Sequence, residues 1–316
     1  MSEKIKLGIS SCLLGNNVRW NGGHKRDRYL TDTLGQFVEW VPVCPEVEVG
    51  LGIPRETLRL VGTADNPRLV TTKTRIDHTD AMQRWARKRL KALENEDLCG
   101  FIFKSDSPSS GMVRVKVYND KGMPEKKGIG IFARAFMDHF PLVPVEEEGR
   151  LNDPLIRETF IEQVFTLKRW RNARQGRNCV GNVVDFHACH KLVLMAHSPR
   201  HLKTMGAMVA RGKDLGCTAL YREYEALLLD ALKLKATVKK HCNVMQHMLG
   251  YFRQDLQADE KQELLEVMEH YRRELVPLVV PLTLFKHYVR KYDQPYLERQ
   301  AYLDPHPVAL KLRNHV

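Results

Sequence analysis

Two thiols, a carboxylate and a serine-rich segment stand where their side chains could do chemistry. Cys12 and Cys44 each follow an apolar run typical of a buried strand, and Glu46 comes two residues after the second thiol. A third apolar run, 100–103, leads into the polar segment 104–111. Each cysteine alone is also compatible with a small buried side chain at a strand end. Together, these residues favour a metal or iron–sulfur site with an acid–base group beside it.

Alternating strands and helices must position these residues. The apolar patterns predict strands over 5–11, 38–43, 100–103 and 113–117, and helices over 79–93 and 129–140. This alternation indicates an α/β domain with a mainly parallel, Rossmann-like sheet. Ligands bind at the carboxyl ends of the strands in such sheets. We therefore expect one pocket, lined by Cys12, Cys44, Glu46, Ser107 and Ser110.

The pattern changes after the charged segment Glu146-Glu147-Glu148. Asn152-Asp153-Pro154 is a helix-start signal, with proline in the first turn. Strand patterns then disappear, and the periodicity predicts helices over 154–171, 183–196, 200–210, 219–234, 238–254, 259–275 and 282–291. We therefore expect two domains, an α/β domain over 1–148 and an all-helical domain over 149–316.

The composition excludes several classes of protein. A hydrophobic fraction of 43% and a charged fraction of 28% fit a globular chain rather than a disordered one. No apolar run approaches the ~18 residues that a membrane span needs. Seven cysteines, an odd number without a secretory signal, favour the reducing cytoplasm and free thiols. The composition does not define an oligomeric state.

The net charge of +12 suggests a polyanionic partner, and nucleic acid is the commonest one. The basic excess is larger in the second half, in clusters such as Lys168-Arg169-Trp170-Arg171, which extends to Arg177. An aromatic ring among cations suits base stacking and phosphate contact. The alternative is a solvated helix face with Trp170 in the core.

A loop and a histidine-rich segment raise two further questions. Arg19, His24, Lys25 and Arg26 share a glycine-containing loop that could cover a base and contact phosphate, although His24 alone is also typical of an exposed loop. The segment 187–197 contains three histidines and one cysteine: His187, Cys189, His190 and His197. They could form a zinc site, a polar seam or an RNA-contact surface.

The motifs are similar to those of a known family. Ser11-Cys12-Leu13-Leu14-Gly15, Cys44-Pro45-Glu46, Pro54-Arg55 and Ser107-Pro108-Ser109 resemble the thiouracil desulfidase (TudS) family over residues 5–140. The segment 186–199 resembles the helical YbgA-like domain that is fused to it in many bacteria. The fused form resembles tRNA 4-thiouridine desulfidases.

The resemblance implies a four-iron, four-sulfur cluster that three cysteines hold and that leaves one iron open. Cys12 and Cys44 match two of the ligands, Glu46 matches the catalytic carboxylate, and Ser107 matches a serine that contacts substrate or water. The open iron would bind the thiocarbonyl sulfur, and the oxygen of water would then replace this sulfur without net electron transfer.

Ser110 departs from the family, which has cysteine at this position. Three explanations are open: an engineered change from cysteine, ligation through the harder oxygen of Ser110, or another thiol in its place. Cys99 is the nearest thiol in sequence. It starts a strand whose far end carries Ser110, roughly 17 Å away at ~3.3 Å per residue.

We therefore expect a cytoplasmic enzyme that converts 4-thiouridine in tRNA to uridine, with the helical domain binding the tRNA. One alternative is desulfuration of free thiouracil or thionucleosides. Another is a non-catalytic iron–sulfur or RNA-binding regulator.

Overall fold

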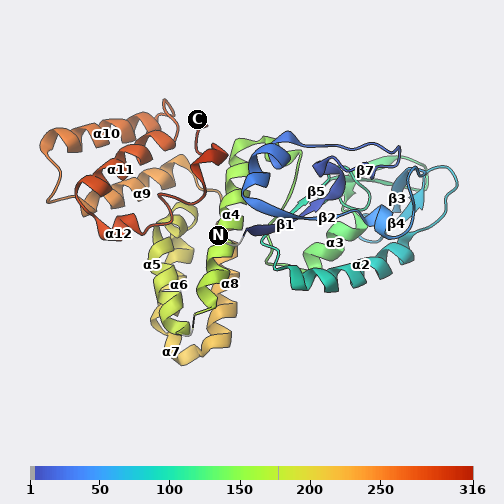
Figure 1. Ribbon diagram of the computed structural model, residues 1–316, viewed down its shortest axis with the longest axis horizontal. Helices are drawn as coiled ribbons and strands as arrows, with labels where there is room; N and C mark the ends of the chain where they lie inside the picture. Colours follow the sequence, from blue (N-terminus) through green and yellow to red (C-terminus); the bar gives the residue numbers. More distant parts are fainter. Residues whose placement is uncertain (1–3, 177, 316) are drawn as a thin grey trace. The chain divides into compact units, whose positions relative to one another are not determined.

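The computed structural model describes residues 4–176 and 178–315, and the chain forms two compact units (Figure 1). The first unit ends at Phe160 and the second begins at Ile161. The division falls inside helix α4, Pro154–Arg174, rather than at the predicted residue 148. The first turns of α4 belong to the α/β unit, because Arg157 lies over the ring of Tyr29 at 4.2 Å.

The first unit contains the predicted parallel sheet. Its strands are β1 (Ile5–Ser10), β2 (Val38–Val43), β5 (Phe101–Phe103) and β8 (Val145–Glu147), in the order β2-β1-β5-β8. All three pairings are parallel, so the α/β class and the parallel sheet are confirmed. Ser10 and Val43 are register partners, which brings the ends of β1 and β2 to the same edge.

Strand β8 corrects the expectation of a charged break at residues 146–148. The side chains of Glu146 and Glu147 are buried, because each carboxylate has polar partners inside the fold. Glu147 Oε1 accepts a hydrogen bond from the backbone N–H of Met112 at 2.7 Å, and Glu146 Oε1 accepts one from Arg150 at 2.6 Å. Two glutamates of this run can therefore lie in a strand, since protein donors replace water.

A second sheet has the order β4-β3-β6-β7 and was largely missed from the sequence. Its strands are β3 (Leu58–Gly62), β4 (Pro67–Thr71), β6 (Val115–Tyr118) and β7 (Pro124–Gly128). The pairs β3–β4 and β6–β7 are antiparallel, and β3 pairs with β6 in parallel. Only β6 was predicted, because β7 reads Pro-Glu-Lys-Lys-Gly and lacks the alternating apolar signal of a half-buried strand.

Two helices cover one face of the parallel sheet. Helices α2 (Thr79–Leu93) and α3 (Ile131–His139) lie side by side below it in Figure 1. The core between the helices and the sheet is aromatic, with Phe101, Phe132 and Phe136 at 0% exposure. Burying each such side chain contributes about 1.5–3 kcal/mol, so this cluster holds the helices on the strands.

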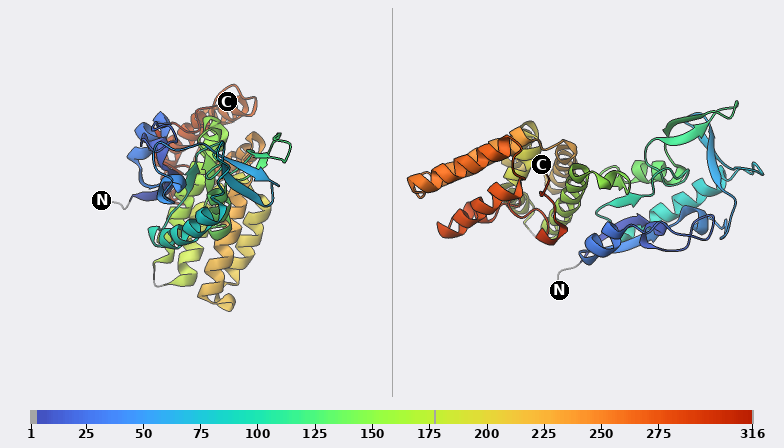
Figure 2. Two further views of the ribbon diagram at one scale, coloured as in Figure 1. Left: turned by 90° about the vertical axis from the view of Figure 1, so that its right-hand side faces the viewer. Right: turned by 90° about the horizontal axis from the view of Figure 1, so that it is seen from above.

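The second unit is helical, as predicted, and each predicted helix is present. Beyond α4 it consists of α5 (Cys179–His197), α6 (Pro199–Ala210), α7 (Gly212–Leu215), α8 (Cys217–Lys233), α9 (Val238–Tyr251), α10 (Ala258–Arg272), α11 (Val279–Lys291) and α12 (Pro295–Glu298). Figure 2 shows α10 and α11 running next to each other, and Tyr288 of α11 donates a hydrogen bond to Glu263 of α10 at 2.8 Å. Across the described residues, no helix is long and apolar enough to cross a membrane.

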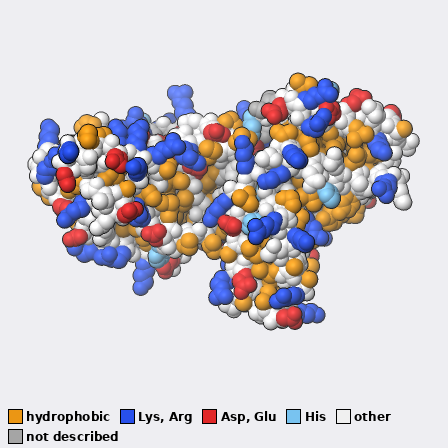
Figure 3. Space-filling view, turned by 180° about the vertical axis from the view of Figure 1, so that it is seen from behind, with side chains coloured by type: hydrophobic (Ala, Val, Ile, Leu, Met, Phe, Trp, Pro, Cys, Tyr) orange, Lys and Arg blue, Asp and Glu red, His pale blue; other side chains and the backbone are white. Residues whose placement is uncertain are grey.

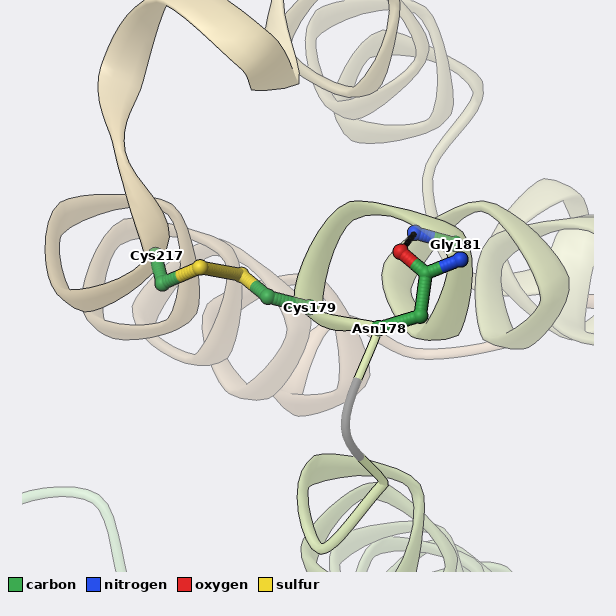
Figure 4. The surroundings of a disulfide bond; sticks show 4 residues. All are labelled: Asn178, Cys179, Gly181 and Cys217. Carbon is green, nitrogen blue, oxygen red and sulfur yellow. Dashed lines mark hydrogen bonds between the residues drawn. A yellow bond between two sulfur atoms is a disulfide. The ribbon is translucent and has the colours of Figure 1, made fainter.

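A disulfide in this unit corrects the expectation that all thiols are free. Cys179 and Cys217 are bonded and join the first residues of α5 and α8 (Figure 4). Asn178 caps α5 beside this bond, because its side-chain oxygen accepts a hydrogen bond from the N–H of Gly181 at 3.0 Å. Cys12 and Cys44 are not part of this bond, and each keeps its thiol.

Candidate functional site

A cavity of about 410 Å³ lies at the edge of the parallel sheet, where β1, β2 and β5 end. Its lining includes all five residues that the sequence analysis placed together, which are Cys12, Cys44, Glu46, Ser107 and Ser110. The strands thus bring three distant segments of the chain to one place, as expected for the carboxyl edge of a parallel sheet. We call this cavity the thiol pocket.

Short helical turns position the two thiols. Cys12 lies in the 3₁₀ turn Ser11–Leu14 directly after β1, and Gly15 ends that turn with φ of +95°. Cys44 is the residue before α1, Pro45–Glu48, and its N–H donates a hydrogen bond to Glu48 Oε1 at 3.0 Å. Each thiol therefore lies in the turn that its strand enters, so both point to the same edge.

The Glu46 carboxylate lies between a thiol, a guanidinium and a hydroxyl. Its Oε2 is 3.6 Å from Cys44 Sγ and 3.9 Å from Arg55 Nη2. Its Oε1 accepts a hydrogen bond from Ser109 Oγ at 2.5 Å. Arg55 is itself held by the carbonyls of Val18 and Gly52, at 3.0 and 3.1 Å. The carboxylate is therefore oriented, and it borders the cavity.

Ser109, which the sequence analysis did not assign a role, contacts this carboxylate. Ser107 Oγ accepts a hydrogen bond from the N–H of Ser110 at 3.1 Å and lies 3.1 Å from Ser109 Oγ. It therefore shapes the turn and also lines the cavity. The sequence signal for Ser109 was the serine-rich turn itself, but spacing could not say which hydroxyl faces Glu46.

The serine turn is held on the first turn of α3. The N–H groups of Phe132 and Ala133 donate hydrogen bonds to the carbonyl of Ser109, at 2.9 and 3.1 Å. Gly130 is required here, because a Cβ at this position would lie 2.5 Å from the Ser109 carbonyl and 2.8 Å from the Ser110 nitrogen. This close approach fixes the hydroxyls relative to the sheet.

Lys104 and Glu148 form an ion pair beside the pocket that the sequence analysis missed. Lys104 follows β5 and lines the cavity, and its Nζ contacts Glu148 Oε1 and donates to Ser105 Oγ at 2.9 Å. Glu148 belongs to the segment that was expected to be a charged break. Only the pairing of β8 with β5 brings this carboxylate next to Lys104.

Burial keeps both pocket thiols protonated. It raises the pKa of Cys12 to about 11, and the charge of Glu46 adds to this. Burial and the same carboxylate raise the pKa of Cys44 to about 12. A thiol under these conditions becomes a ligand only with a cation that stabilises the thiolate and releases the proton.

The predicted basic loop contributes some of its residues to the pocket. Arg19 and Lys25 line the cavity, together with Trp20, which is 45% exposed. His24 and Arg26 are exposed and are not among the lining residues. His24 accepts a hydrogen bond from the N–H of Arg26 at 3.1 Å, and the Arg26 side chain pairs with Asp32 at 2.5 Å. These two side chains therefore shape the loop.

The basic cluster of α4 is mostly built into the helical unit. Trp170 is 0% exposed and Lys168 is 8% exposed, which confirms the alternative in which the ring belongs to the core. Arg169 donates to the carbonyl of Asp304 at 2.9 Å, and burial lowers its pKa. Arg171 is half-buried, and Arg177 lies outside the described residues. The ring in this cluster therefore cannot stack on RNA bases.

The histidine-rich segment lies in the core rather than at a metal site. His190 and His197 donate from Nδ1 to the carbonyls of Phe186 and Leu234, at 2.8 and 2.6 Å, and His187 Nδ1 is 3.1 Å from the hydroxyl of Tyr224. Cys189 accepts a hydrogen bond from Arg299 at 3.6 Å. Within the described ranges, no three His, Cys, Asp or Glu side chains are grouped so as to hold a metal ion.

The donor set of the thiol pocket fits a cysteine-bound cluster with one substitution. The half-buried thiol of Cys12, the buried thiol of Cys44 and the Ser110 hydroxyl line the same cavity. Thiolates are the usual ligands of iron–sulfur clusters, and a serine oxygen is a harder donor for the same iron. Cys99 cannot complete the set, because its N–H bonds to the carbonyl of Lys6, near the start of β1 and at the opposite edge of the sheet.

Comparison with known proteins assigns both units. The family model of 2-thiouracil desulfurase matches residues 7–148, and that of a family of unknown function, DUF1722, matches residues 191–307. The chain is 30% identical to the protein YbgA of Escherichia coli (strain K12) over 155 residues, which are 48% of this chain and 90% of that protein.

Two further relatives match more narrowly. The protein YbbK of Bacillus subtilis (strain 168) is 29% identical over 108 residues, or 33% of this chain and 71% of that protein. A solved structure of a [4Fe-4S]-dependent thiouracil desulfidase, TudS, is 28% identical, covers 48% of this chain and 95% of its own, and has a TM-score of 0.39. From the matches to both units, the chain belongs to the family in which a 2-thiouracil desulfurase domain is joined to a YbgA-like helical domain.

Proposed function

We propose that this protein is a desulfidase that converts 4-thiouridine in tRNA to uridine in the cytoplasm. The observation that carries the proposal is the thiol pocket, in which Cys12, Cys44 and Glu46 border one cavity at the carboxyl edge of the sheet. The reaction consumes one water and releases hydrogen sulfide, so the thiocarbonyl becomes a carbonyl without net electron transfer. The match to the 2-thiouracil desulfurase model supports this class of reaction.

A [4Fe–4S] cluster fits the pocket in this proposal, with Cys12 and Cys44 as thiolate ligands and Ser110 as the oxygen ligand. When bound, such a cluster supplies a soft Lewis acid for the thiocarbonyl sulfur. Because Ser110 is 3% exposed, its oxygen is shielded from bulk water. Ser110→Cys should slow the loss of iron to a chelator, since it replaces the hard donor with a soft one.

Glu46 serves as the general base for the attacking water. Its carboxylate borders the cavity, and the contacts from Arg55 and Ser109 hold it in one orientation. The proton that it takes from water can pass to the departing sulfur, so the carboxylate is regenerated. Lys104 also borders the cavity, and its positive charge favours thiolates, because it lowers the pKa of Cys12 against the effect of burial.

The rim of the pocket supports a nucleotide rather than an apolar molecule as substrate. Trp20 offers a ring for stacking, and Arg19 and Lys25 offer cations for phosphate. Figure 3 shows Lys and Arg side chains over both units, so the excess of positive charge is not confined to the helical unit. Both features favour a polyanionic substrate such as tRNA.

The proposal is tested by turnover under anaerobic conditions. Protein reconstituted with iron and sulfide should remove the thiocarbonyl absorbance of 4-thiouridine-containing tRNA and release sulfide in equal amount. Turnover of free thiouracil with none of tRNA would favour the small-molecule alternative, which the 2-thiouracil family model also supports. Binding of tRNA without loss of the absorbance would favour a regulator.

A further inference from the structure

A second groove, of about 510 Å³, adjoins the thiol pocket on the second sheet. The two cavities share four of their lining residues: Thr57, Leu58, Asp106 and Pro108. The groove continues from these over β3, β6 and β7, where Arg59, Lys116, Tyr118 and Lys126 line it. We call this second cavity the basic groove.

Two lysines lie next to each other on paired strands in the basic groove. Lys116 of β6 and Lys126 of β7 are register partners in an antiparallel pair, and both are exposed. Like charges directly opposite each other on a sheet are unfavourable. The ion pairs among the described residues give neither lysine a carboxylate, whereas neighbouring Lys127 pairs with Glu125 at 3.1 Å. An anion between the two lysines would relieve this repulsion.

Arg59 and Tyr118 form a flat platform beside the lysine pair. The guanidinium of Arg59 lies over the Tyr118 ring, 5.1 Å from its centroid. One guanidinium nitrogen, Nη2, donates to the carbonyl of Thr72 at 2.6 Å, while Nε is buried and has no hydrogen-bond partner. Stacked arginine and aromatic side chains are a common platform for the bases of single-stranded nucleic acid.

The net positive charge of the groove favours a negatively charged ligand. Three cations line it, Arg59, Lys116 and Lys126, against a single carboxylate, Asp106, at the end shared with the thiol pocket. The ligand must therefore carry negative charge and also offer a flat surface to the platform. A nucleotide meets both requirements, because it joins a phosphate to an aromatic base.

We propose that the basic groove binds the single-stranded RNA segment next to the thiolated nucleotide, with a phosphate between Lys116 and Lys126. This inference rests on the proposed function for the choice of RNA. The inference assigns an RNA contact to the α/β unit, next to the thiol pocket. It does not depend on the partly buried basic cluster of α4. A flanking nucleotide held here would keep its neighbour at the mouth of the thiol pocket.

The test measures binding of a sulfur-free oligouridylate to the full chain by fluorescence anisotropy at several salt concentrations. The double variant Lys116→Ala, Lys126→Ala should raise Kd by about ten-fold or more, and it should reduce the salt slope by about 0.7, the value expected for the loss of one phosphate contact with a single strand. Tyr118→Leu should weaken binding without changing the slope, because it removes a stacking surface and no charge.

The matched control is the double variant Lys88→Ala, Lys91→Ala, which removes the same charge from exposed positions on α2. It should leave the Kd within about two-fold, because screening weakens charges that lie beyond a Debye length of ~8 Å. Equal weakening in both double variants, or no change in the groove variant, would overturn the inference. The probe has no sulfur, so its binding does not depend on turnover. If the groove binds the probe as expected but the protein does not desulfurate tRNA, the proposed function is wrong and the inference about the groove stands.

Discussion

The thiol pocket and the histidine core of the helical unit both contain residue types that commonly bind metals, but only the thiols line one cavity together. Burial favours the neutral form of a side chain in each region, because it raises the pKa of Cys12 to about 11 and lowers the pKa of His190 to about 4. The two regions differ in what surrounds the side chains. The thiols border a cavity, whereas His190 and His197 donate to carbonyls of their own helical unit.

This difference shows that residue type and burial alone do not make a metal site. Strand ends leave an open edge where side chains from three segments converge on empty space. Two histidines of α5 instead donate to backbone carbonyls, and each of these hydrogen bonds orients its ring within the core. Four predictions follow from this contrast, from the largest expected effect to the smallest.

Removing either pocket thiol should abolish cluster binding. Cys12→Ala or Cys44→Ala leaves a single thiol in the pocket, so we expect iron content after anaerobic reconstitution to fall to background while far-UV circular dichroism stays unchanged. Cys99→Ala is the control, because that thiol is at the opposite edge of the sheet. Equal iron loss in the control would show that iron binding does not depend specifically on the two thiols of the pocket.

Replacing the pocket carboxylate should stop the chemistry and keep the cofactor. Glu46→Gln preserves shape but removes the base, so turnover of thiolated tRNA should fall by about 10²–10⁴-fold. Iron content should match that of the unmodified protein, since Glu46 is not assigned as a ligand. Turnover within two-fold of the unmodified protein would remove Glu46 from the mechanism.

Removing the hydroxyl that contacts Glu46 should have a smaller effect. Ser109→Ala deletes a hydrogen bond to a charged group, worth about 1.5–3 kcal/mol, or roughly 10–100-fold in turnover. The bond orients the carboxylate, so the pH profile of turnover should also shift. Ser107→Ala is the comparison: it lacks contact with Glu46, so its effect on turnover should be smaller and its pH profile should keep its midpoint. The opposite order would show that the contact of Ser109 with Glu46 does not limit turnover.

The helical unit should become less stable in mild acid. Burial lowers the pKa of His187, His190 and His306 to about 4 and that of His241 to about 3. Between about pH 6.5 and 4 the unfolded chain therefore binds more protons than the folded one, so stability falls as pH falls. Each histidine contributes up to about 1.4 kcal/mol per pH unit.

Hydrogen exchange of peptides from α5 and α9 measures this pH dependence without requiring two-state unfolding of the whole chain. Protection should be constant above about pH 7 and should decrease toward pH 4, after correction for the intrinsic exchange rate. His190→Leu should reduce the slope in α5 whatever its effect at pH 7. A slope that is unchanged in this variant would show that His190 is not a buried neutral group.

Local sequence patterns determined much of this protein. The ranges 38–43 and 79–93 were predicted as they occur, because β2 and α2 have clear apolar periodicity and defined ends. The placement of Cys12 and Cys44 at one edge followed from the rule that parallel strands end together. These inferences needed only neighbouring residues and a general property of sheets.

Tertiary structure alone decided the rest, because it depended on contacts between residues far apart in sequence. Strand β8 exists since donors from residues 112, 113 and 150 satisfy Glu146 and Glu147, and no local pattern encodes those partners. Ser109 lies 63 residues after Glu46 in the chain, and it contacts that carboxylate because hydrogen bonds hold the serine turn on α3. Burial of Trp170 likewise depends on Tyr224, whose ring stacks on it at 4.7 Å. A sequence shows which groups are available, and packing determines which of them face a cavity.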